Sequence, residues 1–319
     1  MRKFLALLLC VLLCLCIFGC GQVSREKNSE KLNIVCTVFP QYDFVRALAG
    51  DKVNLKMLVP LGTESHDFKL ENMSVADIRA VADADLVIYV GGTGDNAWIS
   101  ELKTKVENNA LWLPLTEMTE NLPELASNNM HHAHDHGDHD EACDGEEIDE
   151  HVWTSPIRAG QIVKNIAEVL CELDENNASV YNQNLETYLQ DLDALDSRLK
   201  QLNINGNCLV FADRFPFRYL FADYNLNFEA AFSGCSTVTD PSVAAINSLC
   251  ESATKHNSKV IFYLENSNKI YAEGIAERVG AKPLLLHSCH NITREEFKNG
   301  ATYLSLMNSN IDNITEALK

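Results

Sequence analysis

Short apolar segments alternate with segments of helical periodicity along this chain, and the alternation recurs in two halves. In the first half, strands are predicted at 32–38, 53–59 and 84–90, and helices at 40–49 and 75–82. In the second half, strands are predicted at 208–211, 225–231, 260–264 and 283–286, and helices at 215–224, 241–255, 270–279 and 293–318. Near-continuous apolar strands that alternate with helices are typical of buried parallel sheets. The pattern therefore predicts an α/β fold of two lobes, each a mainly parallel sheet flanked by helices.

Two longer helical segments lie between these halves. Residues 156–172 show helical spacing, and residues 180–202 repeat Leu and Tyr at intervals of three and four. The second segment is the better candidate for a stiff connector between the lobes, since a helix bends less than a Gly/Ser linker. We therefore expect an N-terminal lobe at 32–176, a connecting helix at 177–203 and a C-terminal lobe at 204–319.

The N-terminus has the order of a secretory signal. A basic start is followed by the apolar run 4–18 and then by Gly19 and Cys20. The run is shorter than the roughly 20 residues that a membrane-spanning helix needs. We predict a signal peptide at 1–19 and a tether at 20–31. A Cys directly after a small residue resembles a bacterial lipobox, in which Cys20 would be acylated; the alternatives are an uncleaved anchor and a signal without lipid.

Charge and cysteine content narrow the classes of function. Removal of the signal takes away two positive charges and moves the net charge from -19 to -21. Nucleic-acid binders carry basic patches, so this acidity argues against them. Seven of the eleven cysteines lie beyond Cys20, an odd number that cannot pair completely. The chain has no CxxC pair, so a zinc ribbon is not supported.

A histidine-rich segment interrupts the first half. Five histidines fall within the nine residues 131–139, interleaved with Asp135 and Asp138. The segment has few large apolar residues with which to offset the entropy of ordering, so we predict a loop at 126–150. Such a loop can offer many transient coordination modes to a metal ion; the alternative is a solvated polar loop. Its flexibility indicates a weak collector, and a tight site would have to be rigid.

Several residues able to bind a metal follow predicted strands. Ligands of open parallel sheets bind beyond the carboxyl ends of the strands. The candidates at this edge are His66, His151, Asp213, Glu265, His287, Cys289 and His290. Imidazole and carboxylate both suit Zn²⁺, which prefers about four ligands. Any one of these residues alone is more often a surface, capping or salt-bridge residue.

Three segments carry a resemblance to a known family. They are 34–40, 59–68 and 149–156, which read IVCTVFP, VPLGTESHDF and DEHVWTSP. The chain resembles the metal-binding lipoproteins of bacterial ABC importers for zinc and manganese, the cluster A-I solute-binding proteins. The histidine-rich insertion is similar to that of the zinc-selective branch. The resemblance implies two α/β lobes joined by one long helix, with the metal ion between them.

The resemblance also implies a set of ligands. His66 and His151 match the first two ligands of the family, and His287 occupies the place of the fourth. The third is usually a His or Glu soon after the first strand of the second lobe, where this chain has only Asp213. We therefore predict His66, His151 and His287, with Asp213 or water completing the site and His290 in reserve. Cys235 and Cys289 remain open as a disulfide or as sulfur ligands.

By the same resemblance, the chain is expected to be a monomeric extracytoplasmic lipoprotein, anchored to the cell membrane at Cys20, that binds Zn²⁺ and delivers it to an ABC transporter permease. It is expected not to be an enzyme, and it contains no HExxH motif. The alternatives are a manganese-binding counterpart and a metal-storage or adhesion lipoprotein. The histidine content favours zinc, because Mn²⁺ prefers sites rich in oxygen.

Overall fold

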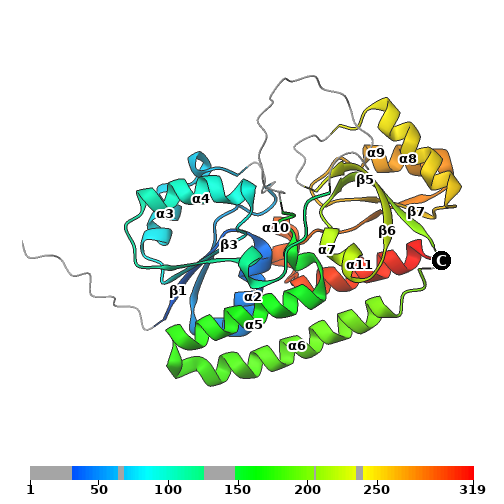
Figure 1. The fold of residues 1–319 in the computed structure, drawn as a ribbon. Coiled ribbons are helices and arrows are strands. Elements are labelled where there is room, and N and C mark those ends of the chain that lie inside the picture. The colour runs from blue at the N-terminus through cyan, green and yellow to red at the C-terminus, as the bar shows by residue number, and fades with distance from the viewer. Residues whose placement is uncertain (1–30, 64–67, 126–147, 205, 235–239) are drawn as a thin grey trace, which may run out of the picture. The chain divides into compact units, whose positions relative to one another are not determined.

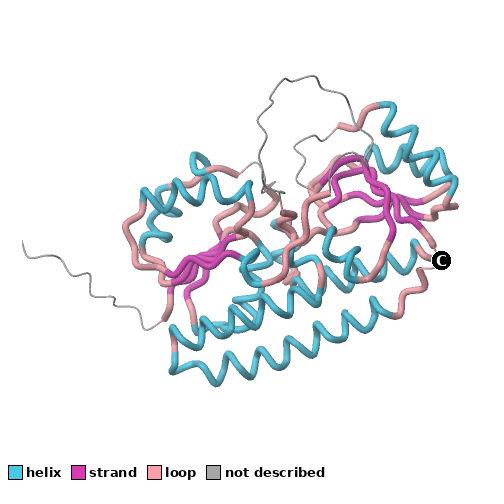
Figure 2. Tube along the Cα trace, in the orientation of Figure 1, coloured by secondary structure: helices cyan, strands magenta, loops and turns pink. Residues whose placement is uncertain are grey.

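The computed structural model describes residues 31–63, 68–125, 148–204, 206–234 and 240–319. The predicted signal peptide, the lipobox Cys20, most of the tether, His66 and all but the last residues of the loop 126–150 lie outside these ranges. Two parallel sheets of four strands each are flanked by helices, as Figures 1 and 2 show. The predicted two-lobe α/β fold is confirmed.

The first sheet has the strand order β2-β1-β3-β4, and every neighbouring pair is parallel. Its strands are β1 Asn33–Cys36, β2 Asn54–Met57, β3 Leu86–Tyr89 and β4 Leu111–Pro114. The helices of this lobe are α2 Phe39–Ala49, α3 Val75–Ala82 and α4 Thr93–Lys105. All four residues of β3 are buried. This burial on both faces explains why the run around β3 is apolar without alternation.

The second sheet repeats this order as β6-β5-β7-β8, again with parallel neighbours. Its strands are β5 Cys208–Phe215, β6 Asn227–Ser233, β7 Val260–Tyr263 and β8 Lys282–Leu285. Its helices are α7 Arg218–Asp223, α8 Val243–Lys255, α9 Ile270–Val279, α10 Arg294–Lys298 and α11 Tyr303–Ala317. In both sheets the next two strands in sequence lie on opposite sides of the first strand: β2 and β3 flank β1, and β6 and β7 flank β5. This reversal makes a crevice beyond the carboxyl ends of β1 and β3 and of β5 and β7.

Two long helices, α5 Pro156–Leu173 and α6 Ala178–Lys200, run beside the lobes (Figure 1). Helix α6 packs on α2 and α5 and also on α11. The buried side chains of this helix are Tyr181, Tyr188, Leu192, Leu195 and Leu199. The main apolar core includes buried residues from both sheets and from these helices. The lobes therefore share one core, which favours small adjustments over wide hinge motion.

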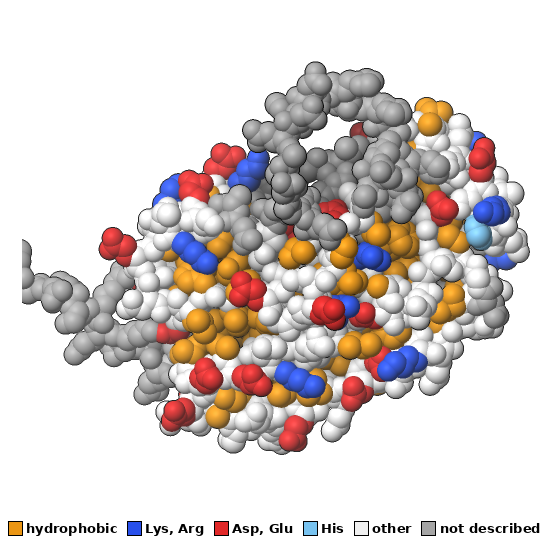
Figure 3. Space-filling model, in the orientation of Figure 1, with side chains coloured by type: hydrophobic (Ala, Val, Ile, Leu, Met, Phe, Trp, Pro, Cys, Tyr) orange, Lys and Arg blue, Asp and Glu red, His pale blue; other side chains and the backbone are white. Residues whose placement is uncertain are grey.

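Single-turn 3₁₀ helices join several elements: Gly50–Lys52, Leu70–Asn72, Leu115–Met118, Val152–Thr154 and Glu175–Asn177. Among the residues described, no helix has the length and apolar character that a membrane span needs. On the face drawn in Figure 3, acidic and basic side chains are interspersed among apolar and polar atoms.

Two expectations about elements were wrong, and two elements were missed. The helix expected over 293–318 is two helices, because Gly300 adopts a left-handed φ of 79° and Thr302 caps α11 by accepting from the Ser305 N–H. The strand expected to end at Phe211 runs to Phe215 through a shift of register. Helix α4 and strand β4 were not predicted.

Candidate metal centre

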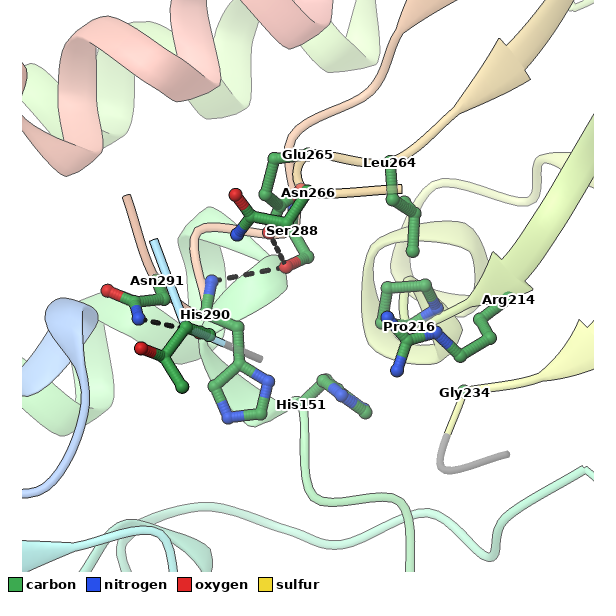
Figure 4. Close-up of a pocket in the computed structure, with 11 residues that line it drawn as sticks. His151, Arg214, Pro216, Gly234, Leu264, Glu265, Asn266, Ser288, His290 and Asn291 are labelled. Atoms are coloured by element: carbon green, nitrogen blue, oxygen red, sulfur yellow. Dashed lines mark hydrogen bonds between the residues drawn. The ribbon is translucent and has the colours of Figure 1, made fainter. Parts of the chain in front are cut away.

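A small cavity of about 20 Å³ lies where segments of both lobes meet. It is lined by Thr63 and His151 from the first lobe, by Arg214 near the end of β5, and by residues that follow strands of the second lobe: Pro216, Gly234, Leu264, Glu265, Asn266, Ser288, His290 and Asn291 (Figure 4). A space of this size holds about one water-sized ligand. We refer to it as the interlobe pocket.

His151 stands just before the 3₁₀ turn Val152–Thr154 and has only 1% of its surface exposed. Its imidazole Nδ1 lies 3.0 Å from Oδ1 of buried Asp149, which also accepts the His151 backbone N–H at 2.9 Å. Burial would lower the pKa of His151, but the charge and hydrogen bond of Asp149 and the charge of Glu150 raise it. The carboxylate favours the tautomer with hydrogen on Nδ1, which makes Nε2 the nitrogen able to bind a metal.

His290 lies beside His151 from the other lobe. The two ring centroids are 5.4 Å apart and the rings are perpendicular. Figure 4 shows the two side chains next to each other at the pocket. The Trp153 indole packs on the His290 ring at 5.0 Å and donates from Nε1 to the Ser288 carbonyl at 2.9 Å. The His290 carbonyl accepts the Phe39 N–H at 3.2 Å, just beyond β1. The two imidazoles are therefore held by buried contacts across the lobes.

Glu265 follows β7 and places a carboxylate at the pocket. It accepts the Ser288 backbone N–H at 2.8 Å and also the Ser288 hydroxyl. The same hydroxyl oxygen accepts the His290 N–H at 3.1 Å. Ser288 therefore fixes the carboxylate and the loop that carries His290 together.

Asn291 links the loop after β2 to the loop after β8 by hydrogen bonds. Its Nδ2 donates to the carbonyls of Pro60 and Thr63, both at 2.8 Å. The Gly62 N–H donates to the Ile292 carbonyl at 2.8 Å. These bonds hold the chain at Thr63 against the pocket, on the segment that leads to His66.

His287 is buried behind the pocket lining, and its Nδ1 lies 3.7 Å from a carboxylate oxygen of Glu265. Its Nδ1 accepts the Cys289 N–H at 2.9 Å, and its Nε2 lies 3.7 Å from a carboxylate oxygen of Glu296. Asn310 binds both its backbone N–H and its carbonyl, each at 2.7 Å. Among the described residues that line the pocket, His287 does not occur.

Asp213 is likewise used inside the second lobe. Its carboxylate accepts the Arg214 N–H at 2.8 Å and the Leu264 N–H at 3.2 Å, joining β5 to the end of β7. It does not occur among the described residues of the pocket lining either. Cys289 is a free and buried thiol, so it forms no disulfide here, while Cys235 lies outside the described residues.

The described part of the chain thus brings together two imidazoles and one carboxylate that is already hydrogen-bonded. Within it, no group of three or more His, Cys, Asp or Glu side chains is placed to hold a metal ion. The donor types suit Zn²⁺, whose remaining ligands would have to come from elsewhere.

Comparison with known proteins decides the family. A profile of the family described as "Zinc-uptake complex component A periplasmic" (ZnuA) matches residues 34–317. The chain belongs to the ZnuA family. The predicted resemblance to the zinc-selective metal-binding proteins is confirmed.

Two relatives and one solved structure are also similar to this chain. The zinc-binding lipoprotein AdcA of Streptococcus pneumoniae serotype 4 is 31% identical over 97% of this chain, which spans 60% of that relative's length. The high-affinity zinc uptake system protein ZnuA of Bacillus subtilis is 28% identical over 95% of this chain and 94% of its own length. The solved Zn(II)-bound ZnuA-like domain of Streptococcus pneumoniae AdcA superposes with a TM-score of 0.71 at 27% identity, over 90% of this chain and 99% of that domain.

Sequence reasoning missed several residues of the interlobe pocket. The sequence places His290 second to His287, marks Glu265 only as one of several candidates, and does not single out Arg214 or Ser288. The clustering of polar residues directly after β7 and β8 was the available signal. The sequence does not show which of them point into the pocket.

Proposed function

We propose that this protein captures Zn²⁺ in the interlobe pocket outside the cytoplasm and hands it to an ABC transporter permease, by binding without catalysis. The observation that carries the proposal is the meeting of the His151 and His290 imidazoles at 5.4 Å between the lobes of a ZnuA-family chain. The zinc-binding names of the relatives and the Zn(II)-bound domain support zinc as the ion.

The proposed ligands are His66, His151 and His290, with the Glu265 carboxylate or an outside donor completing the set. His66 is three residues beyond Thr63, and three residues reach roughly 10 Å when extended. Because Thr63 lines the pocket, His66 belongs to a segment that starts beside it. His287 and Asp213, which the sequence predicts as ligands, have less support, because neither is among the described residues that line the pocket.

The remaining features of the proposal rest on the sequence. They are a signal peptide at 1–19, a lipid anchor on Cys20, a tether at 20–31, a monomeric state and lobes at 32–176 and 204–319 joined through 177–203. The lipoprotein name of the pneumococcal relative supports the anchor. The loop 126–150 would act as a weak collector that raises the zinc concentration near the pocket.

Zinc affinity of single-histidine variants tests the site. We expect H290A to weaken zinc binding more than about 100-fold, beyond what loss of an outer-shell partner costs. H287A should keep affinity within about tenfold of wild type while lowering thermal stability, because the residue is buried among backbone partners. H256A, at the end of α8, is the control and should change neither.

Competition of the purified protein with a zinc-buffering fluorescent chelator measures these affinities. Equal losses in H287A and H290A would return His287 to the ligand set. Unchanged zinc affinity in H290A would show that the interlobe pocket is not the zinc site. Manganese that outcompetes zinc would favour the manganese-binding alternative, and several weak ions per chain without a tight one would favour storage.

A further inference from the structure

Three buried aromatic rings meet at the interlobe pocket. Trp153 is fully buried, and its indole contacts the imidazoles of both His151 and His290. The indole centroid lies 5.6 Å from that of His151 and 5.0 Å from that of His290, and the two imidazoles are 5.4 Å apart. All three distances fall in the range of about 4.5–7 Å over which aromatic rings attract one another. One side chain therefore touches a proposed ligand from each lobe.

Hydrogen bonds hold Trp153 from the side of the second lobe. Its Nε1 donates to the Ser288 carbonyl at 2.9 Å, and the Ser288 hydroxyl oxygen accepts the His290 N–H at 3.1 Å. The Trp153 carbonyl accepts from the Tyr303 hydroxyl at 2.7 Å. Tyr303 is itself fully buried, and its N–H donates to the Asp43 carboxylate of α2 at 2.6 Å. The indole is thus fixed both through its ring and through its backbone.

The turn that carries His151 is held as closely. The backbone N–H and the hydroxyl of Thr154 both donate to the His151 carbonyl, at 3.1 and 2.8 Å. This turn fixes the position of the His151 ring relative to the indole two residues later. Binding groups need to be held to within about 0.5 Å for a site to be selective, and packing of this kind provides such precision.

The spacing of the two imidazoles suits one coordination geometry better than another. Two imidazoles bound to a tetrahedral Zn²⁺ at about 2.0–2.1 Å place their ring centroids about 5.2 Å apart. In adjacent positions of an octahedral site, the geometry that suits Mn²⁺, the centroids come to about 4.5–4.8 Å. The 5.4 Å between His151 and His290 is closer to the tetrahedral value. The two geometries differ by less than about 1 Å, so the packing around the rings decides between them.

We propose that Trp153 is a positioning residue that makes the interlobe pocket prefer zinc to manganese, by holding His151 and His290 at a tetrahedral spacing. The indole binds no metal ion itself. The inference rests on the proposed zinc-binding function and deepens it, because it assigns the choice of ion to a side chain outside the coordination shell. A smaller residue at this position lets the imidazoles approach each other and accommodate an ion of higher coordination number.

The substitution W153F tests this role. It keeps an aromatic ring but removes the N–H donor to Ser288 and part of the contact with both imidazoles. We expect the zinc affinity to fall about tenfold, as on loss of an outer-shell partner. The manganese affinity should stay within about twofold, because Mn²⁺ depends less on imidazole spacing. Chelator competition measures zinc, and the electron paramagnetic resonance signal of free Mn²⁺ measures manganese.

Two further variants keep the test informative. Y303F removes only the hydroxyl that donates to the Trp153 carbonyl, and should lower the zinc-to-manganese affinity ratio in the same direction by a smaller factor. W112F is the matched control: it removes an indole of β4 that packs on Tyr89, outside the described pocket lining, and should keep the wild-type ratio. The ratio compares two ions in one folded variant, so a loss of thermal stability alone does not change it.

Cobalt reports the coordination geometry independently of affinity. Co²⁺ absorbs visible light intensely in tetrahedral sites and weakly in octahedral ones, so the spectrum of the saturated protein shows which geometry the pocket imposes. Wild type and W112F should give the intense spectrum. W153F should give weaker bands for each bound ion.

The outcomes separate this inference from the function on which it depends. A wild-type affinity ratio and cobalt spectrum in folded W153F and Y303F would overturn the role of Trp153 and leave zinc capture intact. So would an equal fall of the ratio in W112F, or an octahedral spectrum in wild type. Absence of zinc binding to wild type would instead overturn the proposed function.

Discussion

The hydrogen bond between Asp149 and His151 offers a direct test of how the site is preorganised. Both side chains are almost wholly buried, at 2% and 1% exposure, and Nδ1 lies 3.0 Å from Oδ1. In D149N the amide oxygen can still accept from Nδ1, so the ring should keep its orientation. The negative charge that raises the basicity of the imidazole is lost.

Loss of such an outer-shell carboxylate lowers metal affinity by about 10–100-fold, equivalent to about 1.4–2.7 kcal/mol. We expect D149N to show a zinc affinity reduced by this amount at pH 7.5, measured by chelator competition. The control is D85N, whose carboxylate accepts the Asn33 N–H at 2.9 Å beside the start of β1. Thermal unfolding establishes that both variants are folded.

Zinc affinity of folded D149N within twofold of wild type would refute this reasoning. So would an equal loss in D85N, since that loss would be a general effect of removing a partly buried carboxylate. Either result would mean that Nε2 of His151 needs no support from Asp149.

Two other substitutions probe packing and ionisation. In G234A the new Cβ would meet the Phe215 carbonyl at 2.9 Å and the His151 ring at 3.4 Å. The substitution should therefore lower the free energy of unfolding by about 1–3 kcal/mol, measured by denaturant titration, and weaken zinc binding, measured by chelator competition. Burial raises the pKa of Asp95 to about 7, against about 3.9 in an unfolded chain, so the wild-type free energy of unfolding should fall as pH rises from about 4 to 7, by on the order of 1 kcal/mol per pH unit. D95N, whose amide oxygen can still accept the Val90 N–H, should show a shallower fall, and parallel curves for the two proteins would contradict the assignment.

The fold was predictable where burial dictates composition. Strand β3 and the equivalent β7 are apolar over their whole length, because helices cover both faces of the sheet. Strand β4, by contrast, is a four-residue segment at the sheet edge with only Pro114 fully buried, so its sequence carries little signal. Helix α4 has an N-terminal turn that contains glycine and shows weak apolar periodicity.

The sequence predicts which loop carries part of the site, but not which histidine of that loop faces the pocket. His287 and His290 are three residues apart in the segment after β8, and the sequence gives no reason to prefer His290. The backbone decides, since Cys289 adopts a left-handed φ of 61° while its N–H binds the His287 ring. This turn keeps His287 within the second lobe and leaves His290 facing the first. A non-glycine residue in this conformation is uncommon and is not readable from composition.

Asp213 illustrates a second limit. A carboxylate just beyond an apolar run suggests a ligand, yet the strand continues past it through a change of register. The carboxylate then lies between β5 and the end of β7, where it accepts the N–H groups of Arg214 and Leu264. Asp213 therefore lies within β5 and not beyond the carboxyl end of the strand, where a ligand is expected.

The amide of Asn291 has a consequence for how cargo leaves. One side chain, next to His290 in sequence, holds two carbonyls of the segment that runs towards His66. A membrane partner that pulled either loop would displace the other as well, so both halves of the coordination shell would loosen in the same event. On the proposed function, the two loops would therefore move together when the ion leaves.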